Sequence, residues 1–334
     1  MTIYDISQKA GVSIATVSRV LNGSDKVSAK TRKKVLDVME QYSYTPNAFA
    51  RGLGLNTTRT IGILCADSSD LYLAKAVFYL EQMLRERGYD SILCCCGYEL
   101  ENKVKYINLL LSKKVDSIIL VGSNFVEANE EDNAYIREVS ELHPVMILNA
   151  DYVCPNVYSC LCDDFHAMYS ATEELISSGR RHILYVYNST SYSGSKKLTG
   201  YTDAMSTHSL KVQTEYVDRR YEAADEILEV ADKLRKYYSL HKNLDAILTS
   251  DDQLALGAVK FARRAGLSIP KDIAIIGYNN SMLAVSNEPE LTSIDNRLEL
   301  LCRQLVNNLA EVLSGNEIPR KTIYSGLLIK RGTT

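Results

Sequence analysis

Residues 13–22 of the chain read SIATVSRVLN, and this short stretch decides the fold of the N-terminal part. Serine is a preferred residue at the start of a helix and Asn-Gly at 22–23 is a usual stop, so the stretch predicts a helix over residues 14–21. At 100° per residue, Val17, Val20 and Leu21 fall on one face, which we expect to pack on a core. The opposite, more polar face is formed by Ala15, Ser18, Arg19 and Asn22.

Two further short helices flank this one. Thr2 caps the first, with Asp5 in its first turn, and Gly11 ends it. Ser28 caps the third, which we expect to run to about residue 42. The apolar stripe of this third helix consists of Val35, Leu36 and Met39. Two short helices joined by a tight glycine-containing turn, followed by a packing helix, are typical of a helix-turn-helix domain, here over residues 1–46.

The polar face of the second helix has the chemistry of a DNA-reading surface. Arg19 can donate two hydrogen bonds to a guanine, and Ala15 can contact a thymine methyl group in the major groove. The alternative is an ordinary solvated arginine on a small helical bundle. The charge distribution favours DNA, because residues 1–59 hold nine basic and four acidic side chains, a net charge of +5. The remaining residues hold 29 basic and 37 acidic side chains, a net charge of −8 that the overall −3 conceals.

Composition and motifs exclude several classes of protein. No apolar run approaches the roughly 18–20 residues of a membrane span, and the N-terminus lacks the features of a signal peptide. The sequence contains no CxxC motif and no paired histidines, so we expect neither a metal nor another cofactor. Six of the eight cysteines lie in short apolar runs and are expected in the core: Cys65, Cys94, Cys95, Cys96, Cys160 and Cys162. We therefore expect a folded cytoplasmic protein.

Catalytic motifs are not evident either. Gly52-Leu53-Gly54 lacks the third glycine of a dinucleotide-binding loop, and no G-x-S-x-G, Walker or H-E-x-x-H motif occurs. Asp163 and Asp164, with His166 nearby, could suggest acid–base chemistry, but neighbouring side chains on a strand point apart. We expect that the protein is not an enzyme.

Several short motifs closely resemble the signature of the LacI/GalR family of transcription repressors: TIYDI at 2–6, AGVS at 10–13, TVSRVLN at 16–22 and YTPNA at 44–48. The similarity continues through TIGI at 60–63 and covers essentially the whole chain. The resemblance implies that Ser13, Thr16 and Ser18 hold phosphates and that Ile14, Ala15 and Arg19 face the bases. The full set of residues that it assigns to DNA is Thr2, Ser13, Ile14, Ala15, Thr16, Ser18, Arg19, Asn22, Asn47, Ala50 and Leu53.

Residues 47–59 correspond to the family's hinge helix and linker. By the resemblance, Leu53 is the wedge that is pressed into the minor groove at the operator centre, where an apolar insertion kinks DNA. Gly52 and Gly54 replace the small or basic residues that are usual beside this leucine, and two glycines make a poor isolated helix. The hinge helix is therefore expected to order on binding, and a plain linker is the alternative.

From residue 60 onward, apolar strand-like runs alternate with helical stretches, which indicates parallel sheets covered on both faces. The expected strands are 60–66, 91–96, 117–121, 145–149 and 157–162, followed by 182–187, 213–217, 246–249 and 273–278. The expected helices include 73–87, 103–112, 167–178, 223–237 and 253–265. Two such series predict two doubly wound α/β halves, in a body that resembles periplasmic sugar-binding proteins. The resemblance places chain crossings near residues 160, 290 and 320.

The effector-binding and dimerisation domain is accordingly expected over 60–334. Its N-terminal half comprises about 60–160 plus 291–320, and its C-terminal half about 161–290 plus 321–334. Ligands bind at the carboxyl ends of strands in such folds, so the loops there nominate an effector pocket. We expect it to be lined by Asp70, Tyr72, Tyr98, Asn149, Ser193, Lys197, Tyr221, Asp251 and Asn279. A loop-capping or solvated role is the alternative for each of them.

Several of these residues depart from the family's pattern. Asp251 stands where asparagine is common, and the stretch that contains Asp70 and Tyr72 replaces the usual Asn-Pro-Phe. Lys197 stands where an arginine usually grips the ligand, and lysine lacks the bidentate fork. Asn279 stands where an aspartate usually accepts from sugar hydroxyls, and an amide is both donor and acceptor. One hypothesis is an anionic sugar derivative, since Lys197, Arg219 and Arg220 add positive charge and one carboxylate is lost.

The expected function is that of a repressor which binds a pseudo-palindromic operator as a homodimer and responds to a sugar or sugar derivative. One helix-turn-helix buries too little surface for high specificity, so two related by a two-fold axis are needed. The helix at 73–87 resembles the family's dimer face through Ala74, Val77, Phe78, Leu80 and Glu81. The alternatives are control by a protein partner and, less in keeping with the motifs, a sugar-binding protein without a regulatory role.

Overall fold

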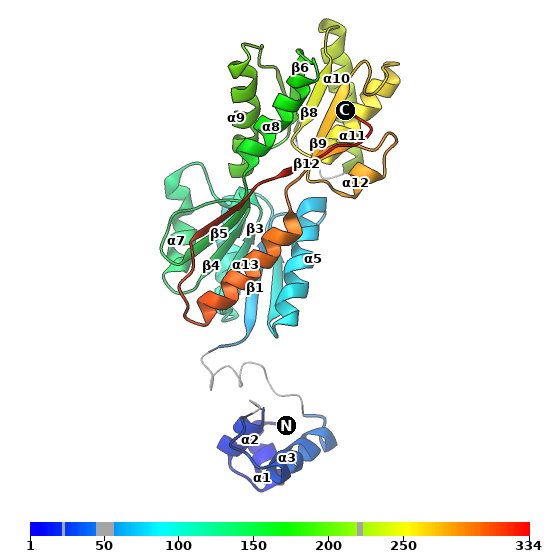
Figure 1. The fold of residues 1–334 in the computed structure, drawn as a ribbon. Coiled ribbons are helices and arrows are strands. Elements are labelled where there is room, and N and C mark those ends of the chain that lie inside the picture. Colours follow the sequence, from blue (N-terminus) through cyan, green and yellow to red (C-terminus); the bar gives the residue numbers. More distant parts are fainter. Residues whose placement is uncertain (22–23, 45–56, 219–222) are drawn as a thin grey trace.

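The computed structural model describes residues 1–21, 24–44, 57–218 and 223–334. Figure 1 shows a small helical head at the N-terminus and a larger body of two α/β halves, one above the other. Within the described residues, no helix is both long enough and apolar enough to cross a membrane.

The head consists of three helices: α1 (Ile3–Ala10), α2 (Ile14–Leu21) and α3 (Ala29–Gln41). Thr2 and Asp5 form a capping box at the start of α1, and Gly11 ends this helix in the left-handed conformation that glycine adopts readily. The helices share one small core formed by Ile6, Ala10, Val17, Val20, Val35 and Met39. The prediction of three short helices is confirmed, and α2 has the predicted bounds.

The predicted burial of one residue in the core of the head was wrong. Leu36 is 47% exposed, whereas Val38 packs against the core. Val35, Val38 and Met39 share one side of the helix, while Leu36 is turned about 100° away from Val35.

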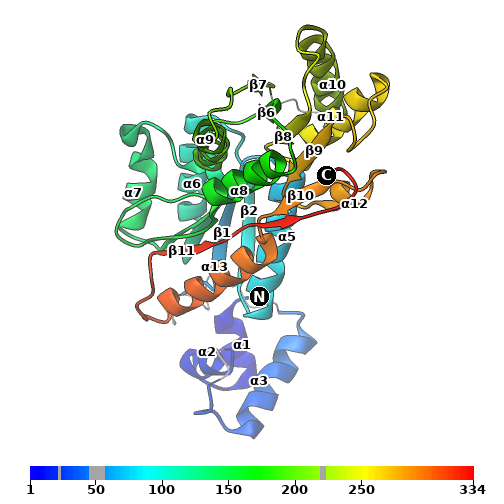
Figure 2. The same ribbon diagram turned by 45° about the horizontal axis from the view of Figure 1, so that its top comes forward.

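The first half of the body is a six-stranded parallel sheet in the order β11-β5-β4-β3-β1-β2. Its strands are β1 (Thr60–Cys65), β2 (Asp90–Cys95), β3 (Ser117–Val121), β4 (Val145–Leu148), β5 (Val157–Cys162) and β11 (Lys321–Tyr324). One face packs against α5 (Leu71–Glu86) and α13 (Leu298–Leu313), the other against α6 (Leu100–Ser112) and α7 (Ala134–Ser140). Figures 1 and 2 both show α13 beside α5.

The second half is a six-stranded sheet in the order β12-β10-β9-β8-β6-β7, parallel except for β12. Its strands are β6 (Ile183–Tyr187), β7 (Thr214–Tyr216), β8 (Ala246–Thr249), β9 (Ala274–Tyr278), β10 (Thr292–Asp295) and β12 (Leu327–Ile329). Helices α8 (Asp164–Ser177) and α9 (Tyr192–Thr207) cover one face. The other is covered by α10 (Ala223–Leu240), α11 (Asp252–Arg264) and α12 (Met282–Val285). Every predicted strand is present within one residue of its predicted ends.

The three crossings between the halves lie slightly later in the chain than predicted. β5 continues in the first sheet to Cys162, beyond the predicted crossing near 160. β10 pairs with β9, so residues 292–295 belong to the second half, not to the first. β11 pairs with β5, so residues 321–324 belong to the first half, not to the second. The predicted boundaries between the halves at 291 and 320 were therefore wrong by a few residues. The strand with which each short strand pairs decides to which half it belongs, and the apolar pattern of the sequence does not show that partner.

The cysteines are free thiols, and seven of the eight are buried. Cys95 is exposed, so its predicted place in the core was wrong. β2 is the edge strand of its sheet, and alternation turns Cys94 and Cys96 inward while Cys95 faces out. In the described part of the chain, no group of His, Cys, Asp or Glu side chains could hold a metal ion.

Candidate functional site

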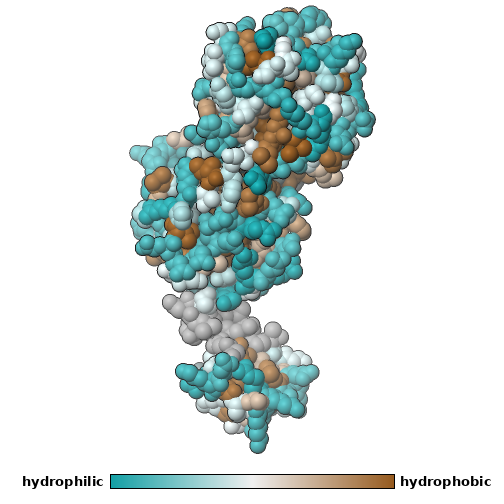
Figure 3. All heavy atoms as spheres, in the orientation of Figure 1, coloured by the Kyte–Doolittle hydropathy of each residue, from teal (hydrophilic) through white to brown (hydrophobic). Residues whose placement is uncertain are grey.

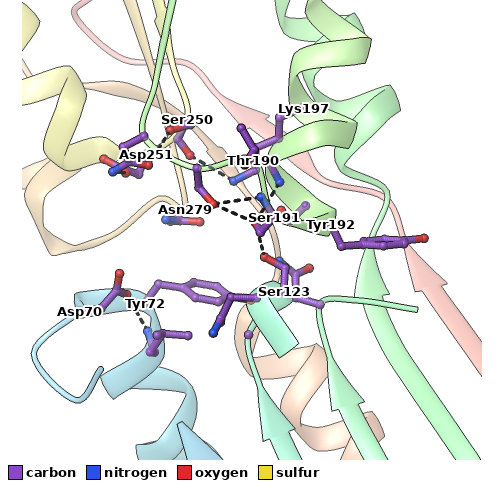
Figure 4. Close-up of a pocket in the computed structure, with 18 of the residues that line it drawn as sticks. Asp70, Tyr72, Ser123, Thr190, Ser191, Tyr192, Lys197, Ser250, Asp251 and Asn279 are labelled. Carbon is purple, nitrogen blue, oxygen red and sulfur yellow. Dashed lines mark hydrogen bonds between the residues drawn. The ribbon is translucent and has the colours of Figure 1, made fainter. Parts of the chain in front are cut away.

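A cavity of about 780 Å³ lies between the two halves, at the carboxyl ends of both sets of parallel strands. The first half contributes the loops that follow β1, β2, β3 and β4. The second half contributes the loops after β6, β8 and β9 together with the start of α9. Figure 4 shows side chains from both halves pointing toward one another across this space.

Eight of the nine residues predicted for the effector pocket line this cavity: Asp70, Tyr72, Tyr98, Asn149, Ser193, Lys197, Asp251 and Asn279. The ninth, Tyr221, lies outside the described residues, as do Arg219 and Arg220. The fold thus brings together residues that are up to about 200 positions apart in the sequence. Their contact with an effector remains a prediction.

Three lining residues also cap helices whose N-termini meet at the cavity. Asp70 accepts a hydrogen bond from the Leu73 amide (2.9 Å) and Asp251 one from the Leu254 amide (2.8 Å). Ser191 caps α9 in the same way. Helix N-termini carry partial positive charge and N–H donors, which favours an oxygen-rich ligand.

Lys197 is anchored in the wall of the second half. Its Nζ donates to the Ser250 carbonyl (3.1 Å) and lies 3.7 Å from the centre of the Tyr278 ring. A cation over an aromatic face is attracted by the ring quadrupole. The lysine that replaces the family's arginine therefore has two protein partners already and is almost fully buried.

Beneath Lys197 lies a buried carboxylate. Asp164 accepts from the Ser193 hydroxyl (2.5 Å) and from the Tyr278 hydroxyl. Burial raises the pKa of Asp164, and the positive charge of Lys197 acts in the opposite direction. The predicted cavity residue Ser193 thus directs its hydroxyl to Asp164.

Asp163 and His166 are separate from this carboxylate. Asp163 caps α8, and its Oδ2 lies 2.7 Å from His166 Nδ1. These residues begin a helix and do not lie on a strand, so our reason for separating them was wrong. They still form no acid–base pair with Asp164, which is buried and bonded to other groups.

Asn149 and Asn279 both follow strands with positive φ, 66° and 92°. Asparagine adopts this conformation more readily than most residues. Asn279 Oδ1 accepts from Asn296 Nδ2 (2.9 Å), and Asn149 Oδ1 accepts from the Cys162 amide (3.4 Å). The positive φ of Asn279 suits asparagine and aspartate alike, so the backbone does not explain why an amide stands here.

Tyr72 extends from the start of α5 toward the second half (Figure 4). Its hydroxyl is buried and has no hydrogen-bond partner among the described residues. Burial raises the pKa of this phenol well above its ordinary value, so it is a neutral group at physiological pH. Its ring contributes to the apolar part of the cavity lining, together with other residues such as Leu73 and Val126.

Sequence reasoning missed Lys103 and Glu127, which line the cavity from α6 and from the loop after β3. Lys103 lies on the buried stripe of α6 together with Ile107 and Leu110. A lysine at the i position of an i, i+4, i+7 apolar stripe is the signal that could have identified it. Glu226 was also missed; it is buried and accepts from Asn188 Nδ2 (3.0 Å).

The head presents the predicted face of α2 to solvent. Ser13, Ile14, Ala15 and Arg19 are exposed, and Thr16 and Ser18 are partly exposed. The Ser13 hydroxyl accepts from the Thr16 amide (3.1 Å), which fixes the start of the helix. Thr2 is exposed at the start of α1, which it caps. The other four predicted DNA contacts, Asn22, Asn47, Ala50 and Leu53, lie outside the described residues.

The sequence matches two parts of one protein family. Residues 2–47 match the bacterial regulatory proteins of the lacI family. Residues 58–331 match the periplasmic binding proteins and sugar binding domain of the LacI family.

Similar proteins extend over nearly the whole chain. An HTH-type transcriptional regulator of Lachnoclostridium phytofermentans is 53% identical, with 100% of this chain and 99% of that protein covered. Catabolite control protein A of Priestia megaterium is 32% identical, with 88% and 87% covered. Among solved structures, the Lac repressor dimer bound to operator and the anti-inducer ONPF has a TM-score of 0.87 at 23% identity, covering 100% of this chain and 98% of that one. The structural similarity to the Lac repressor dimer shows that the two proteins share a fold.

Together these matches decide the class of protein. The relatives are regulators and not enzymes, and both the helical head and the two-half body match parts of the same family. The chain belongs to the LacI family of bacterial regulatory proteins and is a DNA-binding transcriptional regulator.

Proposed function

We propose that the protein is a repressor that binds a pseudo-palindromic operator as a homodimer and is controlled by a sugar or sugar derivative. It would act in the bacterial cytoplasm, on the nucleoid, and in the regulation of carbohydrate metabolism. The observation that carries the proposal is the combination, in one chain, of an exposed recognition face around Arg19 with a ligand-sized cavity between two halves. A volume of about 780 Å³ falls in the range of small-molecule sites, which favours a small effector over control by a protein partner alone.

The proposed dimer surface is the side of the body that carries α5 and α12. Large apolar side chains are exposed on both helices: Leu71, Phe78, Met282 and Val285. Both helices lie on the same side of the body in Figures 1 and 2, and Figure 3 shows apolar residues gathered around α12. A two-fold axis through such a surface would bring two copies of the same patch together. Leu80, which we had included in the dimer face, is fully buried against the sheet and does not belong to it.

The proposed mechanism couples the cavity to the head through the arrangement of the two halves. The chain crosses between the halves three times, after β5, β10 and β11, so the halves can rotate relative to one another about a compact set of segments. An effector that binds one arrangement more tightly than the other shifts the population of dimers that fit the operator. The solved Lac repressor dimer on its operator, which has the same fold, supports this arrangement.

Selection of DNA ligands from a random duplex library by the full-length protein tests the proposal. We expect the selected sequences to converge on a pseudo-palindrome. The binding curve against protein concentration should be steeper in the range in which the dimer forms. Binding without sequence preference, abolished by moderate salt, would reject the operator-binding role. A thermal-shift screen with sugars, sugar acids and sugar phosphates would then find the effector through stabilisation by mass action.

A further inference from the structure

Lys103 is the most deeply buried lysine side chain of the cavity wall. Its Nζ lies 2.5 Å from the Asn124 carbonyl oxygen and 2.5 Å from Glu127 Oε1. The side chain of Lys103 is 3% exposed, whereas that of Glu127 is 28% exposed. Both residues line the cavity, so the pair stands at the boundary between the protein core and the ligand space.

The loop that carries Glu127 is held in place by buried residues. Asn133 accepts from the Glu127 amide (2.8 Å) and donates to the Glu127 carbonyl (3.0 Å). The Tyr135 hydroxyl donates to the Phe125 carbonyl in the same loop. Asn133 and Tyr135 are both buried. The backbone of Glu127 is thus held in place before any ligand arrives, and Lys103 contacts its carboxylate. Such preorganisation reduces the entropy cost of binding.

The pair retains hydrogen-bonding capacity. An ammonium group has three donors, and Lys103 uses two of them within the described residues. The Glu127 carboxylate can accept further bonds on its more exposed side. Asn124 Nδ2, in the same loop, is buried and has no hydrogen-bond partner in the part of the chain that the structure describes. One donor, the Lys103 ammonium, therefore lies beside the Glu127 acceptor, and a second donor, the Asn124 amide, belongs to the same loop of the cavity wall.

The stability of the fold alone does not explain why the Lys103–Glu127 pair and the unpartnered Asn124 amide are buried here. Desolvation of a buried ion pair offsets much of its Coulomb attraction, and an apolar pair of similar size often stabilises a fold as well. A buried donor without a partner adds a further cost. A ligand group that both accepts and donates would satisfy these atoms, and a hydroxyl group does both.

We propose that Lys103 and Glu127 determine effector specificity by recognising two neighbouring hydroxyl groups of a neutral polyhydroxylated ligand. Glu127 accepts from one hydroxyl, while Lys103 and the Asn124 amide donate to the oxygen of the next. The inference rests on the proposed function, because it assigns residues and a ligand class to the same effector site.

The charges of the cavity favour a neutral ligand over the anionic one considered from the sequence. The lining residues that the structure describes include six carboxylates, Asp67, Asp70, Glu127, Glu226, Asp251 and Asp252. They include three lysines, Lys103, Lys196 and Lys197. Lys103 is paired with Glu127, and Lys197 is bound to the Ser250 carbonyl and the Tyr278 ring. An anion placed beside Lys103 would also lie beside the Glu127 carboxylate, which repels it.

Isothermal titration calorimetry of the full-length protein tests the inference. The probes are neutral saccharides (glucose, galactose, xylose and cellobiose) and two anions, glucuronate and glucose 6-phosphate. We expect a neutral saccharide to bind more tightly than either anion. Glu127→Gln and Lys103→Met should each weaken its binding about tenfold or more, since bonds to charged groups are lost. Lys105→Met, the same substitution at an exposed position of α6 outside the cavity, should leave affinity unchanged.

Deoxy derivatives of the bound saccharide separate recognition from a structural role. The wild type and Glu127→Gln should bind the derivative that lacks the recognised hydroxyl with the same affinity. A variant that weakens every derivative by the same factor would show that the pair only supports the loop. Tighter binding of glucuronate or glucose 6-phosphate, or no binding of any neutral saccharide, would also overturn the inference. Thermal unfolding of each variant shows whether it is folded, and the conservative Glu127→Gln variant carries the test if Lys103→Met is unstable.

Measurements of operator binding distinguish failure of the inference about Lys103 and Glu127 from failure of the proposed function. The wild type should bind the selected operator in the absence of saccharide, and Lys105→Met, outside the cavity, should bind it with the same affinity. Loss of saccharide recognition with intact operator binding would reject only the assigned pair and ligand class. Absence of sequence-specific DNA binding by the wild type would reject the proposed function itself.

Discussion

The Ser123 hydroxyl lies 2.9 Å from the Ser191 hydroxyl, a hydrogen bond that joins the two halves across the cavity (Figure 4). Ser123 follows β3 in the first half, and Ser191 caps α9 in the second. The next residue, Tyr192, packs against the core cluster of the first half. The start of α9 is therefore a point of direct contact between the halves, and its contacts depend on how closely the halves approach.

Ser123→Ala should weaken effector binding by removing this bond. A neutral hydrogen bond contributes about 1 kcal/mol, so we expect a loss of about fivefold in affinity, measured by calorimetry with the bound saccharide. Ser123 is the better position to change, because Ser191 also caps α9. Ser206→Ala, at an exposed position of the same helix away from the cavity, is the control. Unchanged affinity in Ser123→Ala would show that the hydrogen bond between Ser123 and Ser191 does not stabilise the ligand-bound arrangement of the two halves.

Arg19→Ala should remove operator selectivity while leaving weak binding to any duplex. A bidentate contact to a base discriminates by about 1–3 kcal/mol, and the residual phosphate contacts fall steeply with salt. Fluorescence anisotropy with the selected operator and a scrambled duplex, at two salt concentrations, measures both effects. Arg235→Ala, a highly exposed arginine on α10 in the body, serves as the control. If selectivity is retained in Arg19→Ala, the recognition face is misassigned.

Phe78→Glu should dissociate the proposed dimer. Phe78 is 53% exposed on α5, and a carboxylate there would be buried opposite its own copy across a two-fold axis. Sedimentation velocity should show a shift toward monomer, together with weaker operator binding. Leu142→Glu makes the same change at a position that is 75% exposed, two residues after α7, and should remain dimeric. Helix α7 and helix α5 lie on opposite sides of the first half (Figure 1). A wild-type protein that is monomeric at all concentrations would contradict the proposed assembly.

The fold was predictable where the local sequence carries its own signal. Strands buried on both faces form continuous apolar runs, as in Ser117–Val121, and these were found within one residue. Residues 292–295 and 321–324, which form β10 and β11, were not predicted as strands and were assigned to the wrong half, because four residues do not specify a pairing partner. Leu36 and Cys95 show the same limit, since the exposure of an apolar side chain depends on the neighbours that the tertiary fold supplies.

The site was predictable where topology alone determines position. Asp70 and Asp251 follow strands β1 and β8, and parallel sheets bring such loops to one edge. Lys103 could not be placed in this way, because it lies within a helix and not in a strand-end loop. Its proximity to Glu127 depends on the conformation of the loop that Asn133 fixes, a contact that no sequence pattern encodes.

Asp252→Asn should remove a pH dependence of stability. Burial raises the pKa of Asp252 from 3.8 to about 6, although the Ser293 hydroxyl and the Ser281 amide donate to its carboxylate and act in the opposite direction. A carboxyl group whose pKa is higher in the folded state stabilises the fold below its unfolded pKa and loses this contribution as pH rises through the folded value. The unfolding free energy of the wild type, relative to Asp252→Asn, should therefore fall by up to about 3 kcal/mol between roughly pH 4 and pH 7. Urea denaturation across this range measures the difference, with Asp203→Asn at an exposed position of α9 as the control. A difference that is flat or that rises with pH would mean that Asp252 is not held in its protonated form by burial.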